Sequence, residues 1–577
     1  MEPISDSPPS GRRFRKASGW IALAAILIGE FLLTDTWLSR NCTWIYPRWN
    51  DQIQYLGEAY SSYDIAREHG LAQGLWHAAI KPSAQGMLYA PAAVLVFRLA
   101  GSSRSAALAL NVLAWIALQG AFFWAASRAL GSRILAWSAA GLLLCWGTPL
   151  SGGPGSASDF RLDLMAACAY GVALALAQNT DGFRSTPRSL LFGVAVGLTF
   201  LVRFLTGVYF AVLFMGLLGW TLLLPGRGRR ALNLTAAMAT AAAFAGPVVW
   251  LNRDWIWTYY GIGHFTGPES AIRDSHLGIA ASLAFVGRSL EEHLGGWFLG
   301  GALVVTLVLG LGAVFARVRG RGPEGPAPAL GPWLVPAAWF TAAPALVLAS
   351  HNEKSPVVVS ILVPGATALI LGLWQWLGRG WRRILPGAAV PWLGAAVSCA
   401  AMVYGAGHFL ARQRVDPNSA AFVRDARKVN ALADLIFNAG RKPGLTALRV
   451  GVDQVTDCLD AQVLRIVCYE RHHVWLPLVM TLPTGIIRER EALLMERVAQ
   501  SDFVFLAVGD ISAGGYPYDE QMRSLRPQTL AWCDANLRRI DRFPLFGRTW
   551  ALYGRADPAS INADDPGPSG RRGGAGR

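Results

Sequence analysis

Asp51 is the residue of this sequence that most strongly indicates chemistry. It follows Asn50 in an aromatic-rich segment between the first apolar stretch of the chain and the second. An ionisable side chain beside a membrane-spanning stretch is costly to place, so it is a functional candidate by default. Lysine or arginine recurs at the ends of later apolar stretches, at Lys81, Arg203 and Lys354. Together these residues indicate chemistry at the surface of a lipid bilayer.

The residues after Asp51 predict a helix that lies in the membrane interface. Apolar and aromatic side chains recur at helical spacing, at Ile53, Leu56, Tyr60 and Tyr63, and so form one stripe of a helix. The alternative role for Asp51 is structural, because a carboxylate in the first turn caps a helix and complements its dipole. The residues alone leave both roles open.

Lys354 stands where a phosphate group could bind. It precedes Ser355 and Pro356, a pair typical of a helix start, and an apolar run follows. A phosphate at that place would meet both a cation and exposed backbone N–H groups. Lys81 stands in a similar position ahead of the apolar run Met87–Phe97.

Arg203 interrupts the long apolar run Leu190–Leu224. The interruption indicates either a functional charge at a membrane span or a break between two helices, with the guanidinium reaching water. A further charged patch, made of Asp159, Arg161 and Asp163, stands at the entrance to the apolar stretch that begins near residue 162. Its alternatives are a helix start and a surface ion pair.

The composition of the chain is that of a membrane protein, so we expect a bilayer to surround the elements that position these residues. Of 577 residues, 53% are hydrophobic and only 15% are charged, and the mean hydropathy is +0.33, which is too apolar for an ordinary soluble protein. Apolar runs recur from Gly19 to Tyr404, and they predict about ten to thirteen membrane crossings. The chain is therefore predicted to be a polytopic α-helical membrane protein.

The formal net charge of +15 could indicate nucleic-acid binding. The basic residues instead form short clusters beside apolar stretches, as at Arg12–Lys16 and Arg379–Arg383, which is the pattern that sets membrane orientation. We therefore expect no nucleic-acid partner, a cytoplasmic N-terminus and a location in the cytoplasmic (inner) membrane. The stretch Gly19–Thr34 lacks a clear cleavage site and predicts a retained first helix. A full crossing by Met87–Ala100 would place Arg128 outside, against this pattern, whereas a re-entrant or surface-lying segment would agree with it.

The chain divides into predicted regions of different composition. These are a cytoplasmic segment (1–17), a membrane domain (18–412) with an external first loop (37–85), an external α/β domain (413–556) and a disordered tail (557–577). Within the α/β domain, the patterns predict helices at 421–439 and 487–499 and strands at 448–452, 503–508 and 549–553. One disulfide among Cys458, Cys468 and Cys533 is left open.

These features, in their order along the chain, resemble the GT-C-type glycosyltransferases, especially the branch of protein O-mannosyltransferases and lipid A aminoarabinose transferases. The resemblance covers about residues 18–405 and is carried by Asn50-Asp51 through Tyr55, Lys81-Pro82-Ser83, Arg161 with Asp163, Gly197–Arg203 and Lys354–Pro364. The chain also departs from the family pattern. Gln52 stands in place of a second acidic residue, Ser83 in place of a second proline and Arg203 in place of a lysine, and the aromatic residue expected after Lys354 is absent.

The resemblance implies a GT-C-like membrane domain and an inverting sugar transfer. The donor would be a polyprenyl-phosphate sugar, and the acceptor a hydroxyl of a lipid, a glycan or a protein on the external face of the membrane. Asp51 would act as general base, and Lys81, Arg203 and Lys354 would hold the lipid phosphate. The residues expected to contact the sugar or the acceptor are Tyr55, Asp159, Arg161, Asp163, His264 and Arg273. No cofactor is expected, and a divalent metal is not favoured because the first loop has no Asp-x-Asp pair for it.

Two other classes of protein fit parts of the pattern. A secondary transporter would show two similar halves and charges near the middle of its spans, whereas most charges here stand at span ends. A membrane glycan polymerase or ligase also uses polyprenyl-linked substrates, but it places its main loop later in the chain. Glycosyl transfer is therefore the preferred interpretation.

Overall fold

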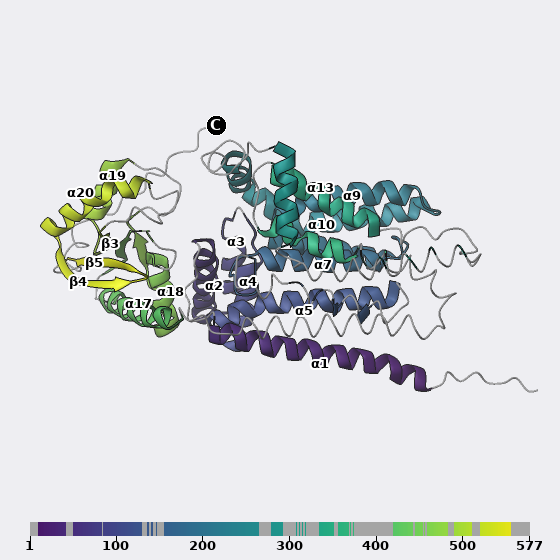
Figure 1. Cartoon of the computed structure of the whole chain (residues 1–577), viewed down its shortest axis with the longest axis horizontal. Coiled ribbons are helices and arrows are strands. Elements are labelled where there is room, and N and C mark those ends of the chain that lie inside the picture. Colours follow the sequence, from purple (N-terminus) through teal and green to yellow (C-terminus); the bar gives the residue numbers. More distant parts are fainter. Residues whose placement is uncertain are drawn as a thin grey trace, which may run out of the picture. The chain divides into compact units, whose positions relative to one another are not determined.

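The structure of the chain is a computed structural model. It describes residues 10–41, 50–83, 85–129, 155–264, 278–291, 334–350, 356–368, 419–441, 445–453, 459–482, 490–509 and 520–555, together with isolated residues between these ranges. The chain forms two compact units (Figure 1). The membrane unit comprises Met1–Thr43 and Trp76–Val415, and the C-terminal unit comprises Trp44–Leu75 and Asp416–Arg577.

All the regular secondary structure in the described part of the membrane unit is helical. Its elements are α1 (Ser10–Asn41), α4 (Tyr89–Ala100), α5 (Arg104–Ala129), α7 (Asp163–Gln178), α8 (Thr186–Val202), α9 (Thr206–Leu222), α10 (Arg227–Ile256), the π-helix η2 (Trp257–His264), α13 (Leu334–Ser350) and α14 (Pro356–Ser360); α3 (Leu71–Ile80) spans the border between the units. Helices α1, α5 and α7 run alongside one another in Figure 1, and α5 packs against both of the others.

Three helical stretches of the described residues are long and apolar enough to cross a membrane: Trp20–Arg40, Arg104–Arg128 and Arg227–Ile262. Shorter apolar helices accompany them. Helix α4 has 12 residues and is therefore about 18 Å long, well short of a hydrocarbon core of about 30 Å. Its length favours the re-entrant or surface-lying alternative for this segment.

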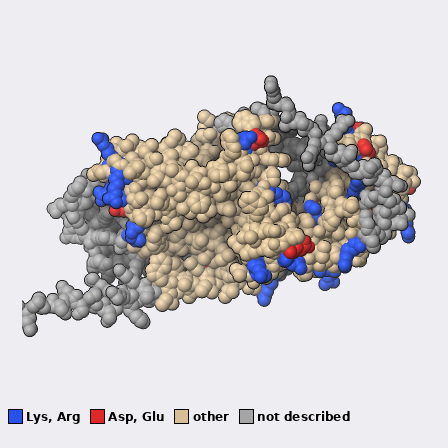
Figure 2. Space-filling model, turned by 180° about the vertical axis from the view of Figure 1, so that it is seen from behind, with Lys and Arg blue, Asp and Glu red and all other residues tan. Residues whose placement is uncertain are grey.

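The outer surface of the membrane unit is apolar, as expected where lipid is the solvent. Leu99, Leu223 and Leu251 expose 90%, 85% and 77% of their surface. Figure 2 shows a broad surface over these helices without Lys, Arg, Asp or Glu, and basic side chains gather at one end of it. This distribution agrees with an integral membrane protein.

Helix α8 approaches α10 closely because glycine lies at the contact. A Cβ added to Gly193 would overlap the carbonyl oxygen of Ala237, and one added to Gly197 would lie 2.8 Å from Cβ of Phe244. Small residues permit this close packing of membrane helices. Gly197 therefore has a packing role.

The apolar run around Arg203 forms two helices, as the second alternative predicts. Arg203 is buried, however, so its guanidinium does not reach water as that alternative expected. Helix α8 ends at Val202 and α9 begins at Thr206. Between them Arg203 has an extended backbone, with φ −149° and ψ 113°. The hydroxyl of Thr206 donates to the carbonyl oxygen of Arg203 at 2.8 Å. This bond satisfies a carbonyl group that lies outside the regular hydrogen bonding of a helix, because the helix is interrupted there.

The C-terminal unit contains a five-stranded sheet in the order β2-β1-β3-β5-β4. Its elements are α2 (Asn50–His69), α17 (Ser419–Gly440), β1 (Leu448–Val452), α18 (Ala461–His472), β2 (Leu478–Met480), α19 (Glu491–Ala499), β3 (Phe503–Val508), α20 (Glu520–Asn536), β4 (Arg538–Leu545) and β5 (Arg548–Gly554). Strand β1 is parallel to both its neighbours, and β5 is antiparallel to β3 and β4. The three predicted strands are confirmed as β1, β3 and β5.

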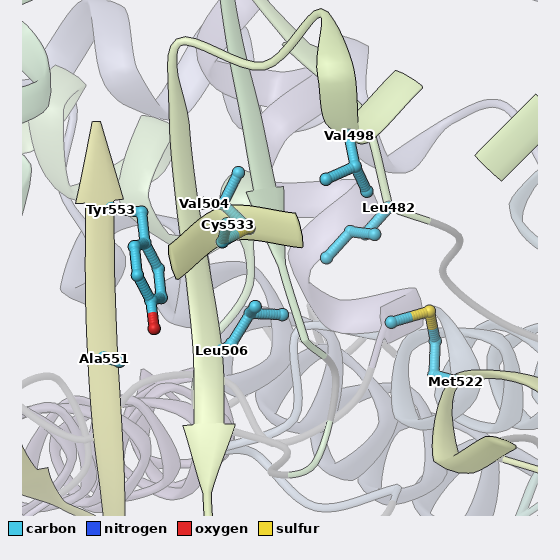
Figure 3. Packing of buried hydrophobic residues seen from close by; sticks show 8 residues of the cluster. All are labelled: Leu482, Val498, Val504, Leu506, Met522, Cys533, Ala551 and Tyr553. Carbon is cyan, nitrogen blue, oxygen red and sulfur yellow. The ribbon is translucent and has the colours of Figure 1, made fainter. Parts of the chain in front are cut away.

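One face of this sheet carries an apolar core (Figure 3). Val504 and Leu506 stand two residues apart on β3, so their side chains point to the same face of the sheet. Cys533 of α20 packs in the same cluster. Cys468 and Cys533 are both free and buried, so neither forms the disulfide left open by the sequence. Burial raises the pKa of each thiol to about 12, which keeps both uncharged.

Helix α2 is part of the C-terminal unit, where it packs on α18. Tyr60 has no exposed surface, and the centre of its ring lies 4.8 Å from that of Tyr469. The stripe predicted to lie in the membrane interface is thus covered by protein at Tyr60. The physical reason is that α18 supplies both an aromatic face for this ring, at Tyr469, and a carboxylate for its hydroxyl, at Glu470. The predicted first loop, residues 37–85, consequently divides between the two units.

Candidate active site

The break between α8 and α9 places Arg203 inside the protein. Arg203 is 5% exposed. Its Nη1 donates to Oε1 of Gln85, and its Nη2 lies 3.5 Å from Oδ1 of Asp163. Asp163, the first residue of α7, is 1% exposed. A buried guanidinium requires such a partner, because removing an unpaired charge from water costs several kcal/mol.

Arg161 connects this pair to a second carboxylate. Its Nε lies 3.8 Å from Oδ2 of Asp163, and Nε and Nη2 donate to the carboxylate of Asp159 at 2.8 to 3.1 Å. Asp159 also accepts from the backbone N–H of Gly155, and its carbonyl oxygen accepts from Asn111 on α5 at 2.6 Å. The predicted patch is therefore a buried ion-pair network, not a surface ion pair.

The segment that follows Lys81 is fixed to the helix break by backbone hydrogen bonds. The N–H of Phe204 donates to the carbonyl oxygen of Gln85 at 2.8 Å, and the N–H of Met87 donates to that of Leu201 at 2.8 Å. Between them, a Cβ added to Gly86 would overlap the carbonyl oxygen of Val202. Only glycine permits this approach of two backbones, and the approach brings the Gln85 side chain to Arg203.

The end of α10 and helix η2 meet the same segment. Gln85 Nε2 donates to the hydroxyl of Tyr259 on η2 at 2.7 Å. Asn252, near the end of α10, accepts from the backbone N–H of Ser83 at 3.0 Å. We call the resulting group the Arg203 cluster; it consists of Gln85, Asp159, Arg161, Asp163, Arg203 and Tyr259. It joins segments that lie up to about 170 residues apart in sequence.

Gly86→Ala is expected to destabilise the membrane unit and to lower the affinity for any ligand of Arg203. The methyl group would displace either the backbone at Val202 or the Gln85 segment, and overpacking of this kind typically costs about 1–3 kcal/mol. Thermal unfolding of the purified protein in detergent measures the effect. Gly219→Ala on α9 is the matched control, because an added Cβ there meets nothing within 4 Å. Equal midpoints for the two variants would contradict the role given to Gly86.

Gln85, Gly86, Asn252 and Tyr259 were not among the predicted site residues. A weak signal existed for Gly86, because glycine just before an apolar run marks a turn or a close backbone approach. The polar residues of this group have no such signal. Each is identified only by a partner that is distant in sequence.

The predicted base and its neighbour lie in the other unit. Asp51 is half-buried in the first turn of α2, and Tyr55 is 6% exposed. Both belong to the C-terminal unit, whereas Lys81 and Arg203 belong to the membrane unit. The position of Asp51 in the first turn also fits the alternative role of complementing the helix dipole.

The remaining predicted residues are only partly described. Lys81 is half-buried at the start of the segment that carries Gln85. His264 ends η2, but its side chain lies outside the described residues, as do Arg273 and Lys354 altogether. Among the described residues, no group of three or more His, Cys, Asp or Glu side chains could hold a metal ion. The Arg203 cluster contains two guanidinium groups, those of Arg161 and Arg203. The planar donors of a guanidinium suit phosphate or carboxylate oxygens.

No protein-family model matches the chain, and no curated protein matches it by sequence. By structure it is similar to ArnT from Cupriavidus metallidurans in the apo state, with 15% identity and a TM-score of 0.56 over 95% of this chain and 99% of that one. The same ArnT bound to undecaprenyl phosphate matches with 14% identity and a TM-score of 0.56 over 94% and 99%. This chain has a GT-C-type fold.

The GT-C likeness includes both units of the chain. A match over 95% of the residues cannot leave out the C-terminal unit, whose segments are Trp44–Leu75 and Asp416–Arg577. A lower likeness exists to the oligosaccharyltransferase of Archaeoglobus fulgidus tethered with an acceptor peptide. It has 12% identity and a TM-score of 0.42 over 84% of this chain and 69% of that one.

Proposed function

We propose that this chain is a GT-C glycosyltransferase of the cytoplasmic membrane. It transfers a sugar, with inversion, from a polyprenyl-phosphate donor to an acceptor hydroxyl of a lipid, a glycan or a protein on the external face. The observation that carries the proposal is the buried Arg203 cluster in a fold shared with ArnT, for which a complex with undecaprenyl phosphate is known.

Binding of the donor phosphate is assigned to Lys81, Arg203 and Lys354. Two features support this role for Arg203: its guanidinium is removed from water and is held by Gln85 and Asp163. In such a site of low dielectric, a cation interacts with phosphate oxygens far more strongly than it does in water. Arg161 and Asp163 hold Arg203 in place.

The transfer step uses Asp51 as general base. Its carboxylate accepts the proton of the acceptor hydroxyl as that oxygen forms a bond to the anomeric carbon of the sugar. The bond between the anomeric carbon and the phosphate oxygen breaks, and its electron pair leaves with the polyprenyl phosphate. Attack from the side opposite the phosphate inverts the anomeric carbon. The three cations compensate the charge of the leaving group, so the proposal includes no metal cofactor.

The other predicted residues take different roles. The carboxylate of Asp159 is occupied by Arg161 and by the N–H of Gly155, so we assign it to holding Arg161 and not to contacting a sugar. Tyr55, His264 and Arg273 remain proposed contacts of the sugar or the acceptor.

Undecaprenyl phosphate is expected to stabilise the purified protein against unfolding. A ligand that binds only the folded state adds about 2.7 kcal/mol at a hundredfold excess over Kd. The measurement is the thermal unfolding midpoint in detergent micelles at increasing concentrations of the lipid. Undecaprenol, which has the same chain and no phosphate, is the control and should leave the midpoint unchanged. Equal effects of the two lipids, or none from either, would contradict the proposed donor class.

A further inference from the structure

Helix α2 contacts the rest of the C-terminal unit along one continuous stripe. Gly57, Tyr60, Asp64 and Arg67 follow one another at spacings of three or four residues, so they lie on one face of the helix. Each of them meets a residue between Tyr469 and Trp475, at the end of α18 or just after it. One face of α2 therefore packs along the end of α18 and the residues that follow it, through several contacts and not through one bond alone.

The contacts in this stripe combine packing with polar bonds. The hydroxyl of Tyr60 donates to Oε1 of Glu470 at 2.8 Å. The Trp475 indole lies against Gly57, where an added Cβ would be 3.4 Å from the ring, and it also packs edge-on against Tyr469. Tyr60 of the stripe, together with Glu470 and Trp475 opposite it, forms the centre of this contact.

Two further bonds fix the helix along its axis. The backbone N–H of Trp475 lies 3.4 Å from Oδ2 of Asp64, to which it donates, and Nη1 of Arg67 donates to the carbonyl oxygen of His473 at 2.9 Å. His473 has a left-handed backbone, with φ 54°, and it ends α18 so that the chain can turn toward α2. Rotation or sliding of α2 would break several of these contacts together.

Asp51 stands on the same rigid helix, six residues before Gly57. That separation is about 9 Å along the axis, so the contacts that fix α2 also fix the position of Asp51. We propose that Tyr60, Glu470 and Trp475 are positioning residues for Asp51, and that the sheet-bearing part of the C-terminal unit thereby holds the general base. This inference rests on the function proposed above, in which Asp51 is the base.

The test removes the Tyr60–Glu470 bond and measures transfer with a polyprenyl-phosphate sugar. Tyr60→Phe and Glu470→Ala are expected to lower kcat roughly ten- to a hundredfold, because a shift of a catalytic group by about 1 Å can cost a hundredfold. The KM for the donor should stay unchanged, since the proposed phosphate ligands lie in the membrane unit. Glu470→Gln keeps an oxygen that accepts from Tyr60 and should restore most of the rate. Glu496→Ala, on an exposed position of α19, is the control.

A double-mutant cycle separates positioning from general loss of structure. In an Asp51→Asn background, Glu470→Ala should lower the remaining rate no further, because a misplaced base and a missing base are equivalent. A full additional loss in that background, or unchanged kcat in Tyr60→Phe and Glu470→Ala, would overturn the inference and leave the proposed function standing. Full activity of Asp51→Asn would instead refute the proposed function.

Discussion

Asp51→Asn is expected to lower the rate of sugar transfer by about 10²–10⁴-fold, which is the usual contribution of a general base. The amide has nearly the shape of the carboxylate, but it does not accept the proton of the acceptor hydroxyl. The KM for the donor should change little, because Lys81 and Arg203 lie in the other unit. Transfer from a radiolabelled polyprenyl-phosphate sugar by purified protein measures the effect.

The same variant distinguishes the catalytic role of Asp51 from its structural alternative. If Asp51 only complements the dipole of α2, its loss costs about 0.3–1 kcal/mol of stability and leaves the rate intact. Glu68→Gln is the matched control, because Glu68 is an exposed carboxylate at the opposite end of the same helix. A normal rate with a slightly lower unfolding midpoint would refute the catalytic role.

Arg203→Ala is expected to destabilise the membrane unit and to abolish the stabilisation by undecaprenyl phosphate. It leaves Asp163 buried without its Arg203 partner, and breaking a buried ion pair in this way costs about 3–5 kcal/mol. The unfolding midpoint without lipid measures the first effect, and the shift on adding undecaprenyl phosphate measures the second.

A second variant separates the two consequences of losing Arg203. Arg203→Ala combined with Asp163→Ala removes both charges and should recover part of the stability, but it should not recover the response to undecaprenyl phosphate. Arg253→Ala is the control, because the ion pair of Arg253 with Asp254 lies at the surface, where the Arg253 side chain is 52% exposed. The stability of this variant should stay within about 0.5 kcal/mol of that of the unchanged protein. A double variant that still responds to the lipid would exclude Arg203 from the phosphate site.

The features predicted correctly from the sequence are those that neighbouring residues control. The break at Arg203 follows from a charge within an apolar run, since that charge cannot remain in lipid without a partner. Strands β1, β3 and β5 are apolar segments in a domain of mixed composition, and their burial on both faces gives a readable local pattern. Strand β4 was missed because it exposes most of its side chains.

The partners of these residues depend on contacts between distant segments. Gln85 lies 118 residues from Arg203, and Tyr60 lies 410 residues from Glu470, so no local periodicity relates them. The stripe on α2 shows the limit most directly, because an amphipathic helix has the same pattern whether lipid or protein covers it. Local order of polar and apolar residues therefore specified the helices, the strands and the break. The folded chain alone decided which surface covers α2 and which side chains surround Arg203, because burial and hydrogen bonding depend on what meets in space.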